Sequence, residues 1–68
     1  MSGDEVCLLL AAHGFVRVRQ KGSHAVMQRR TAMGTTTVPV PLHTELKTGT
    51  LACIIRQSGL PRELFETQ

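Results

Sequence analysis

The sequence predicts a single α+β domain in the order helix, strand, strand, strand, helix, with a three-stranded antiparallel sheet and both helices on one of its faces. Residues 3–13 and 48–58 carry apolar side chains three and four positions apart, which is typical of helices with one buried side. Residues 15–40 instead alternate apolar with polar side chains or are rich in Thr and Val, as strands are. The 68 residues allow one domain, 1–68, and no large substrate cavity.

The first helix, expected over residues 3–13, begins with a capping box and ends at a glycine. Ser2 can accept a hydrogen bond from the backbone of Glu5 while the Glu5 side chain reaches back to Ser2. The buried stripe of this helix is Val6, Leu9 and Leu10. Gly14 suits a left-handed helix end, with Phe15 placed to pack back onto the helix.

Two strands of a hairpin follow, at about residues 15–21 and 23–29. If Lys21 and Gly22 form a two-residue loop, Arg19 lies opposite His24 on one face of the hairpin. The other face then collects Val16, Val18, Ala25 and Met27. This assignment depends on register, because a shift by one residue sends every side chain of the second strand to the opposite face.

A third strand is expected over residues 35–40, after a loop at 31–34. Pro39 cannot donate a hydrogen bond to a neighbouring strand, so this strand should have a free edge. A partner chain could add to such an edge.

The second helix should begin with Thr48 as its cap and end at Gly59. Its buried stripe is Leu51, Ile54 and Ile55. A last turn at 61–65 should fold Leu64 and Phe65 onto the same core.

The charges are unevenly distributed along the chain, whose net charge is +3. No acidic residue occurs between Val6 and Thr44, a stretch that holds Arg17, Arg19, Lys21, Arg29 and Arg30. With both helices on one sheet face, the other face should be open and basic, and such a face attracts a polyanion. The predicted layout is that of double-stranded-RNA-binding domains, although a fold does not fix a function.

The sequence indicates neither a disulfide framework nor a metal site. Cys7 and Cys53 stand far apart without a CxxC pair, so both are expected as small buried hydrophobic residues. The histidines lack metal-ligand spacing, and we expect no metal and no cofactor. No apolar run is long enough for a membrane helix, and residues 1–5 are acidic where a signal peptide is basic. The expected location is the cytoplasm.

Several short motifs follow one another along the chain: Gly14-Phe15, the run from Arg19 to His24, Val38-Pro39-Val40, His43, and Gly49-Thr50-Leu51. Together they resemble the HicA toxin family over nearly the whole chain. That resemblance implies a metal-independent endoribonuclease (mRNA interferase) of a bacterial toxin–antitoxin pair, with a double-stranded-RNA-binding-like fold and a histidine after Gly-Ser as the catalytic group.

The resemblance places the catalytic role on His24, with Lys21, Gly22 and Ser23 as the turn that presents it. The chemistry is plausible for these residues, because an imidazole changes protonation close to neutral pH and can take a proton from an RNA 2′-hydroxyl. Arg19 and Lys21 could neutralise charge in the transition state. The leaving 5′-oxygen also needs a proton, and either His43 or water could supply it.

The RNA-binding residues are therefore expected to be Arg17, Arg19, Lys21, Gly22, Ser23 and Lys47. Lys47 is included because it precedes the free backbone amides of the second helix, where a phosphate could bind. The expected partners are mRNA and a HicB-like antitoxin that covers the basic face and His24. Two alternatives stay open: a non-catalytic RNA-binding module, and a protein-interaction module that uses the free edge of the third strand.

Overall fold

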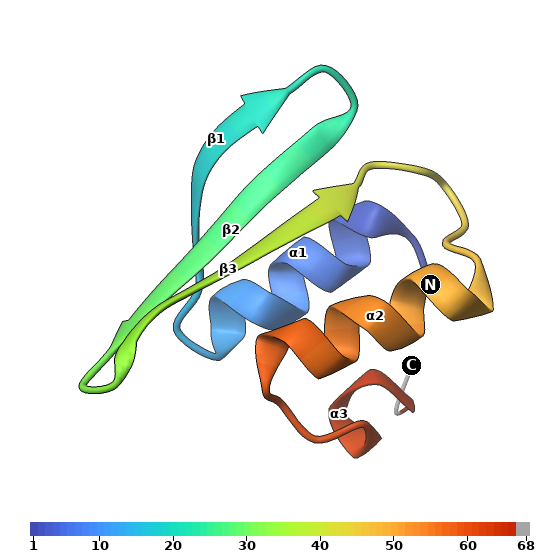
Figure 1. Ribbon diagram of the computed structural model, residues 1–68. Coiled ribbons are helices and arrows are strands. Elements are labelled where there is room, and N and C mark those ends of the chain that lie inside the picture. Colours follow the sequence, from blue (N-terminus) through green and yellow to red (C-terminus); the bar gives the residue numbers. More distant parts are fainter. Residues whose placement is uncertain (67–68) are drawn as a thin grey trace.

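The computed structural model describes residues 1–66, and its elements follow one another in the predicted order (Figure 1). They are α1 (Gly3–Ala12), β1 (Val16–Lys21), β2 (His24–Thr31), β3 (Gly34–Pro41), α2 (Thr48–Ser58) and the short α3 (Glu63–Glu66). The predicted α+β fold class is confirmed. Both β2 and β3 are longer than predicted, because the loop that joins them is only the dipeptide at 32–33.

The sheet has the antiparallel order β1-β2-β3, with the helices together on one side of it (Figure 1). Side chains alternate between the two faces of a strand, and Ala25 and Met27 of β2 are buried together with Val38 and Val40 of β3. These four face the helices, where Leu10 and Ile54 complete the core. The other face carries no covering element among residues 1–66, and β3 has the free edge that Pro39 predicted.

Helix α1 has the capping box predicted for it. Ser2 Oγ accepts from the Glu5 amide at 3.1 Å, and Glu5 Oε1 accepts from the Ser2 amide at 2.7 Å. The hydrogen bond from the Ser2 backbone holds the pKa of Glu5 below its usual value. At the other end Gly14 has a φ of 94°, a conformation that glycine adopts at little cost.

The predicted register of the first hairpin is wrong, because the loop lies one residue further along the chain and each nearby residue of β1 pairs two positions further along β2. The loop is Gly22-Ser23, so Lys21 pairs with His24, and Arg19 pairs with Val26. The reason is that Gly22, with a φ of 58°, takes the first loop position, where a type II′ turn requires glycine.

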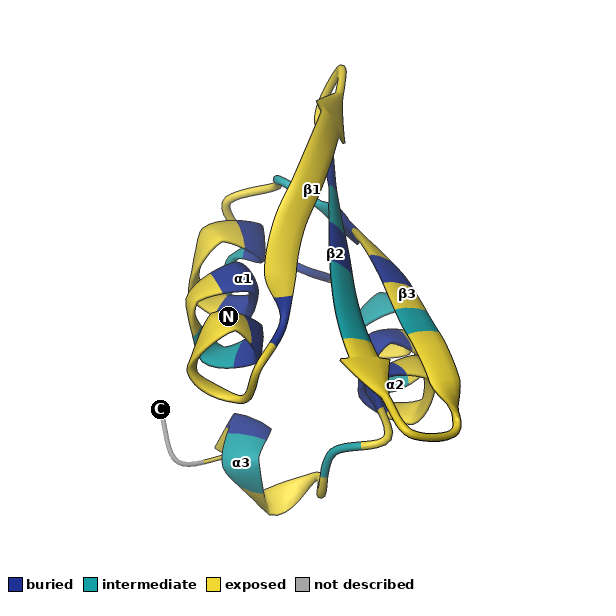
Figure 2. Cartoon of the chain, turned by 90° about the vertical axis from the view of Figure 1, so that its left-hand side faces the viewer, coloured by how far each residue is buried: buried dark blue, intermediate teal, exposed yellow. Residues whose placement is uncertain are grey.

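Strand β1 also departs from the prediction that Val16 and Val18 join the core, because both are more than half exposed. The pairing shifts between Arg17 and Arg19, which marks a β-bulge at Val18. This extra residue reverses the alternation along β1, and the whole strand is exposed (Figure 2). Val16 therefore lies opposite Gln28 on the open face, while Arg17 lies opposite the buried Met27.

Arg29 belongs to the helix side of the sheet and not to the open basic face. Its guanidinium donates to the carbonyl of His13 at the end of α1 (3.3 Å) and to that of Ser58 at the end of α2 (3.4 Å). It also lies 4.8 Å from the centroid of the Phe15 ring. One side chain thus ties the carboxyl ends of two helices to the sheet, where a cation is favourable for both helix dipoles.

Four smaller predictions, on the two ends of α2, the cysteines and the last turn, have mixed outcomes. The N-cap is Lys47, which makes no side-chain capping bond, so the assignment of Thr48 as the cap was wrong. Gly59 ends the helix in the left-handed conformation, as predicted. Cys7 is buried but Cys53 is exposed, because Cys53 falls on the solvent side of α2. The last turn packs onto the core through Leu64 and the buried Phe65, as expected.

Candidate active site

His24 is the first residue of β2 and lies at the end of the sheet where the chain reverses direction. It pairs with Lys21 of β1 on one side and with Pro41 of β3 on the other. Directly paired residues point to the same face, so the side chains of His24 and Lys21 share the open face. Lys21, Gly22, Ser23 and His24 are all exposed, and this end of the sheet is open to a large ligand.

The turn that carries His24 is held in place from both sides. The backbone amide of Leu42, just after β3, donates to the carbonyl of Ser23 at 2.6 Å. Gln20 Nε2 donates to the carbonyl of Gly22 at 3.3 Å, and Arg17 Nη1 donates to Gln20 Oε1 at the same distance. These contacts restrict the movement of the hairpin end and fix the position of the His24 backbone.

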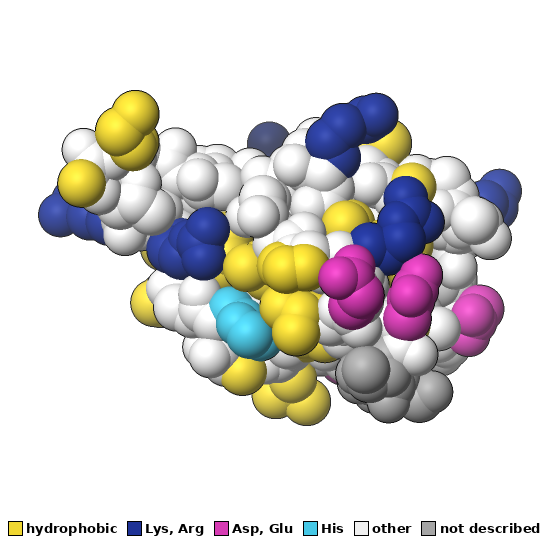
Figure 3. All heavy atoms as spheres, turned by 90° about the horizontal axis from the view of Figure 1, so that it is seen from below, with side chains coloured by type: hydrophobic (Ala, Val, Ile, Leu, Met, Phe, Trp, Pro, Cys, Tyr) yellow, Lys and Arg dark blue, Asp and Glu magenta, His cyan; other side chains and the backbone are white. Residues whose placement is uncertain are grey.

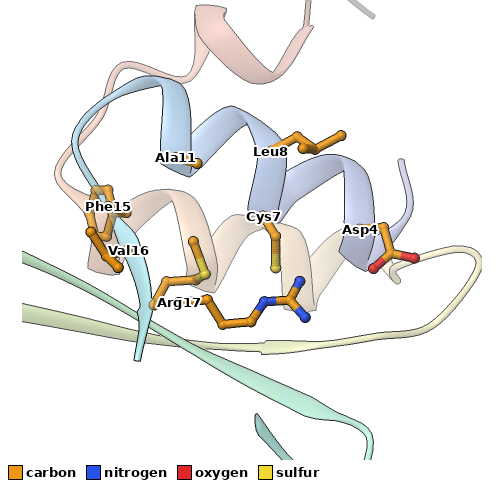
Figure 4. A pocket seen from close by; sticks show the side chains of 8 residues that line it. Asp4, Cys7, Leu8, Ala11, Phe15, Val16 and Arg17 are labelled. Carbon is orange, nitrogen blue, oxygen red and sulfur yellow. The ribbon is translucent and has the colours of Figure 1, made fainter. Parts of the chain in front are cut away.

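Arg17 lies apart from the other predicted RNA-binding residues. Together with Cys7, Asp4 and Leu8 it lines an apolar groove of about 520 Å³ between α1 and β1 (Figure 4). Burial raises the pKa of the Cys7 thiol, and the nearby Arg17 guanidinium partly opposes that change. The bulge at Val18 is the reason that Arg17 does not share a face with His24.

The open face has positive charge without opposing acidic groups. Arg19, Lys21 and Arg30 lie on it. Lys21 and Arg19 are paired with His24 and Val26 of the open face, and Arg30 lies an even number of residues from both along β2. The acidic side chains visible in Figure 3, from the side of α3, gather next to the carboxyl end of the described chain. A polyanion can therefore approach the open face without meeting carboxylates in β1, β2 or β3.

The segment from Leu42 to Leu46 leads from the end of β3 to α2 and carries His43. It is fixed to the start of α1, because the Gly3 amide donates to the His43 carbonyl and the Leu46 amide donates to the Met1 carbonyl, both at 2.9 Å. Gly3 allows this close approach, since a Cβ there would collide with the backbone of Pro41. His43 is exposed and follows Pro41, the pairing partner of His24, by two positions.

Within residues 1–66, the side chains of His24 and His43 make no hydrogen bond or ion pair. Lys47 is exposed at the start of α2. The fold therefore brings Lys21 next to His24 and places Arg19 on the same face.

Residues 1–66 contain no group of three or more His, Cys, Asp or Glu side chains that could hold a metal ion. None of the helices in that range is long and apolar enough to cross a membrane.

Comparison with known protein families decides the class of this molecule. The family model described as the HicA toxin of bacterial toxin–antitoxin systems matches residues 3–60, which include every element from α1 to α2. The chain belongs to the HicA toxin family. Its role is thus that of a toxin, and an antitoxin is the kind of partner that the family implies. No curated protein matches the chain.

Two residues whose roles the sequence did not predict support the candidate site. Gln20 supports the turn carbonyl, and Gln28 on the open face donates from Nε2 to Thr37 Oγ1 at 3.2 Å. Gln28 has no distinctive sequence signal, because its bond depends on the register of β3 against β2. Gln20 contacts only residues two and three positions away, but glutamine is not a characteristic turn residue.

Proposed function

We propose that this HicA-family toxin is an endoribonuclease (mRNA interferase) in which His24 acts as the general base. The observation that supports the proposal is the exposed imidazole of His24 on a fixed turn, paired with Lys21 at the end of an open cationic face. An imidazole placed in this way can reach the backbone of an RNA strand that lies along the sheet.

The proposed reaction needs only groups of the protein and the RNA, with or without a water molecule, and it uses no metal. A ring nitrogen of His24 takes the proton of a 2′-hydroxyl, and that oxygen forms a bond to the adjacent phosphorus. The bond from phosphorus to the 5′-oxygen breaks, and the departing oxygen takes a proton from His43 or from water. The products are a 2′,3′-cyclic phosphate and a 5′-hydroxyl.

In this proposal Lys21 and Arg19 stabilise the negative charge that accumulates on the phosphate oxygens during attack. Gly22 and Ser23 let the RNA backbone approach the turn closely, and Lys47 could hold a more distant phosphate at the start of α2. Arg17, from the groove side, supports the turn through Gln20.

A HicB-like antitoxin that covers His24 and the open face would silence the toxin by excluding RNA. Because mRNA is the proposed substrate, the cytoplasm is the proposed place of action. The alternative of a non-catalytic RNA-binding module uses the same cationic face without the chemistry of His24.

The test is cleavage of a long single-stranded RNA in EDTA by the wild-type chain, His24→Ala and His13→Ala, with RNA binding measured in parallel. His13 is a matched control, since it is also an exposed histidine but lies at the end of α1. Cutting by wild type and His13→Ala, with a loss of at least about a hundredfold in His24→Ala and binding retained, supports the proposal. Binding without cutting by any of the three proteins favours the non-catalytic module. Equal cutting by all three excludes His24 as the base.

A further inference from the structure

The open face has a second feature, a hollow that lies further along β2 from His24. Gly14, Val16, Val18, Gln28 and Arg30 surround a shallow hollow of about 440 Å³ on this face. Val16 is 62% exposed and Val18 is 51% exposed, although both are apolar. No element among residues 1–66 covers them, and the bulge in β1 is what turns them away from the core.

The polar part of the hollow is held in a fixed position. The half-buried side chain of Gln28 donates one N–H from Nε2 to Thr37 Oγ1 of the neighbouring strand at 3.2 Å. Its Oε1 has no hydrogen-bond partner among the described residues, and the second N–H of the amide is likewise unused. An orientated amide therefore presents one acceptor and one donor beside apolar side chains.

The lining matches the chemistry of a nucleobase. The valines can cover the flat apolar surface of a base, and the Gln28 amide can bond to its edge, as side-chain amides do in base recognition. Arg30 adds a guanidinium, which can stack on a base or pair with its phosphate. The face contains Arg19 and Lys21 as well and has no acidic residue, so its charge complements a nucleic acid strand.

The hollow and the proposed active site share the open side of β2. His24, Val26, Gln28 and Arg30 alternate along the open side of β2. Gln28 is four residues from His24, or about 13 Å at roughly 3.3 Å per strand residue. A base in the hollow therefore belongs to a nucleotide beyond the one attacked at His24, at a constant offset from the cut.

We infer that this hollow is a nucleobase subsite in which Gln28 reads one base of a single-stranded RNA at a fixed distance from the phosphate at His24. The inference rests on the proposed ribonuclease function and adds a determinant of its sequence preference. Val16 and Val18 hold the base, and Arg30 holds the strand where it leaves the subsite.

The first test compares cleavage of a single-stranded RNA of randomised sequence by wild type, Gln28→Leu and Gln57→Leu. Gln57 is a matched control, because it is an exposed glutamine on α2 and lies outside the hollow. Wild type and Gln57→Leu should prefer one base by about tenfold at one position offset from the cut, and Gln28→Leu should lose that preference. Identical sequence preferences for all three proteins would overturn the subsite and leave the ribonuclease intact.

A second variant separates the base contact from the contribution of Gln28 to stability. Thr37→Val removes the same cross-strand hydrogen bond but retains the amide of Gln28. Thr37→Val should weaken the base preference without abolishing it or moving its offset, because the amide is still present but no longer held, whereas Gln28→Leu should abolish the preference. Loss of the preference in Thr37→Val together with retention in Gln28→Leu would contradict a direct role of the amide.

The third test does not depend on cutting. His24→Ala is mixed with a short single-stranded RNA, and the side-chain amide signals of Gln28 and Gln57 are followed by NMR. The subsite predicts that the Gln28 signals shift on titration and that the Gln57 signals do not. RNA binding with unchanged Gln28 signals refutes the subsite, whereas shifted Gln28 signals in a protein whose wild type does not cut would support the subsite and refute the ribonuclease.

Discussion

Replacing Arg29 by methionine removes the charged group that joins the two helix ends to the sheet while retaining most of the aliphatic stem. Two hydrogen bonds disappear, to the carbonyls of His13 at 3.3 Å and Ser58 at 3.4 Å. Hydrogen bonds that involve a charged group contribute about 1.5–3 kcal/mol each, and at these longer distances about 1 kcal/mol each is a fairer value. The contact with Phe15 adds about 0.5–1 kcal/mol.

One contribution has the opposite sign. Arg29 Nε is buried without a hydrogen-bond partner among the described residues, and methionine relieves that unpaired donor. The net expectation for Arg29→Met is therefore a loss of about 2 kcal/mol from the free energy of unfolding, estimated from these hydrogen-bond and cation–π contributions. For a domain of this size, such a loss lowers Tm by about 8–16 °C.

The assay is reversible urea or thermal unfolding followed by circular dichroism, with Arg30→Met as the control. Arg30 is the next residue along β2 and is exposed on the opposite face, so its replacement should change stability by less than about 0.5 kcal/mol. Equal stability of the two variants would refute the role assigned to Arg29. A double-mutant cycle with Phe15→Leu should return about 0.5–1 kcal/mol for the ring contact alone.

Three further predictions use the same unfolding measurements or simple chemical labelling. Gly3→Ala should destabilise by more than about 3 kcal/mol or prevent folding, because its Cβ would collide with backbone at the end of β3, whereas Gly49→Ala, with open space around it, should change stability by no more than about 1 kcal/mol. The lowered pKa of Glu5 means that its capping bond stabilises the fold above the ordinary carboxyl pKa and is lost as pH falls through the folded value. Glu5→Gln should thus lose less stability than wild type between pH 6 and pH 3, and equal losses would exclude a capping contribution. A thiol reagent should modify Cys53 at once and Cys7 only slowly, since Cys7 is buried and burial raises its pKa; comparable rates in the folded protein would contradict that burial.

The sequence was sufficient for the elements whose signals are local. The capping box at Ser2 and Glu5 and the glycine at position 14 set both ends of α1 in agreement with the structure. The alternation around Ala25 and Met27 correctly identified the buried face of β2. These features need only residues that are neighbours in the chain.

The sequence was sufficient to locate the hairpin that carries His24 but not to assign the register of its two strands. Two turn geometries fit the run from Lys21 to His24, and they differ only in which loop position Gly22 occupies. The bulge at Val18 has no sequence signal, because an extra residue in one strand is defined by its pairing with another. Its effect was to exchange the faces of Arg17 and Val16, which moved a predicted RNA-binding residue into the groove and two valines onto the open face.

The sequence by itself determined the order of the elements, the family motifs and the stretch of positive charge, since these are properties of residues near one another in the chain. Only the tertiary structure distinguished Arg29 from Arg30, two identical neighbours of which one stabilises both helix ends and the other faces the solvent. The same holds for Gln28, whose fixed amide depends on a threonine of another strand. The physical reason is that the face and the partner of a strand residue are set by long-range pairing, which depends on the whole sheet and not on local sequence.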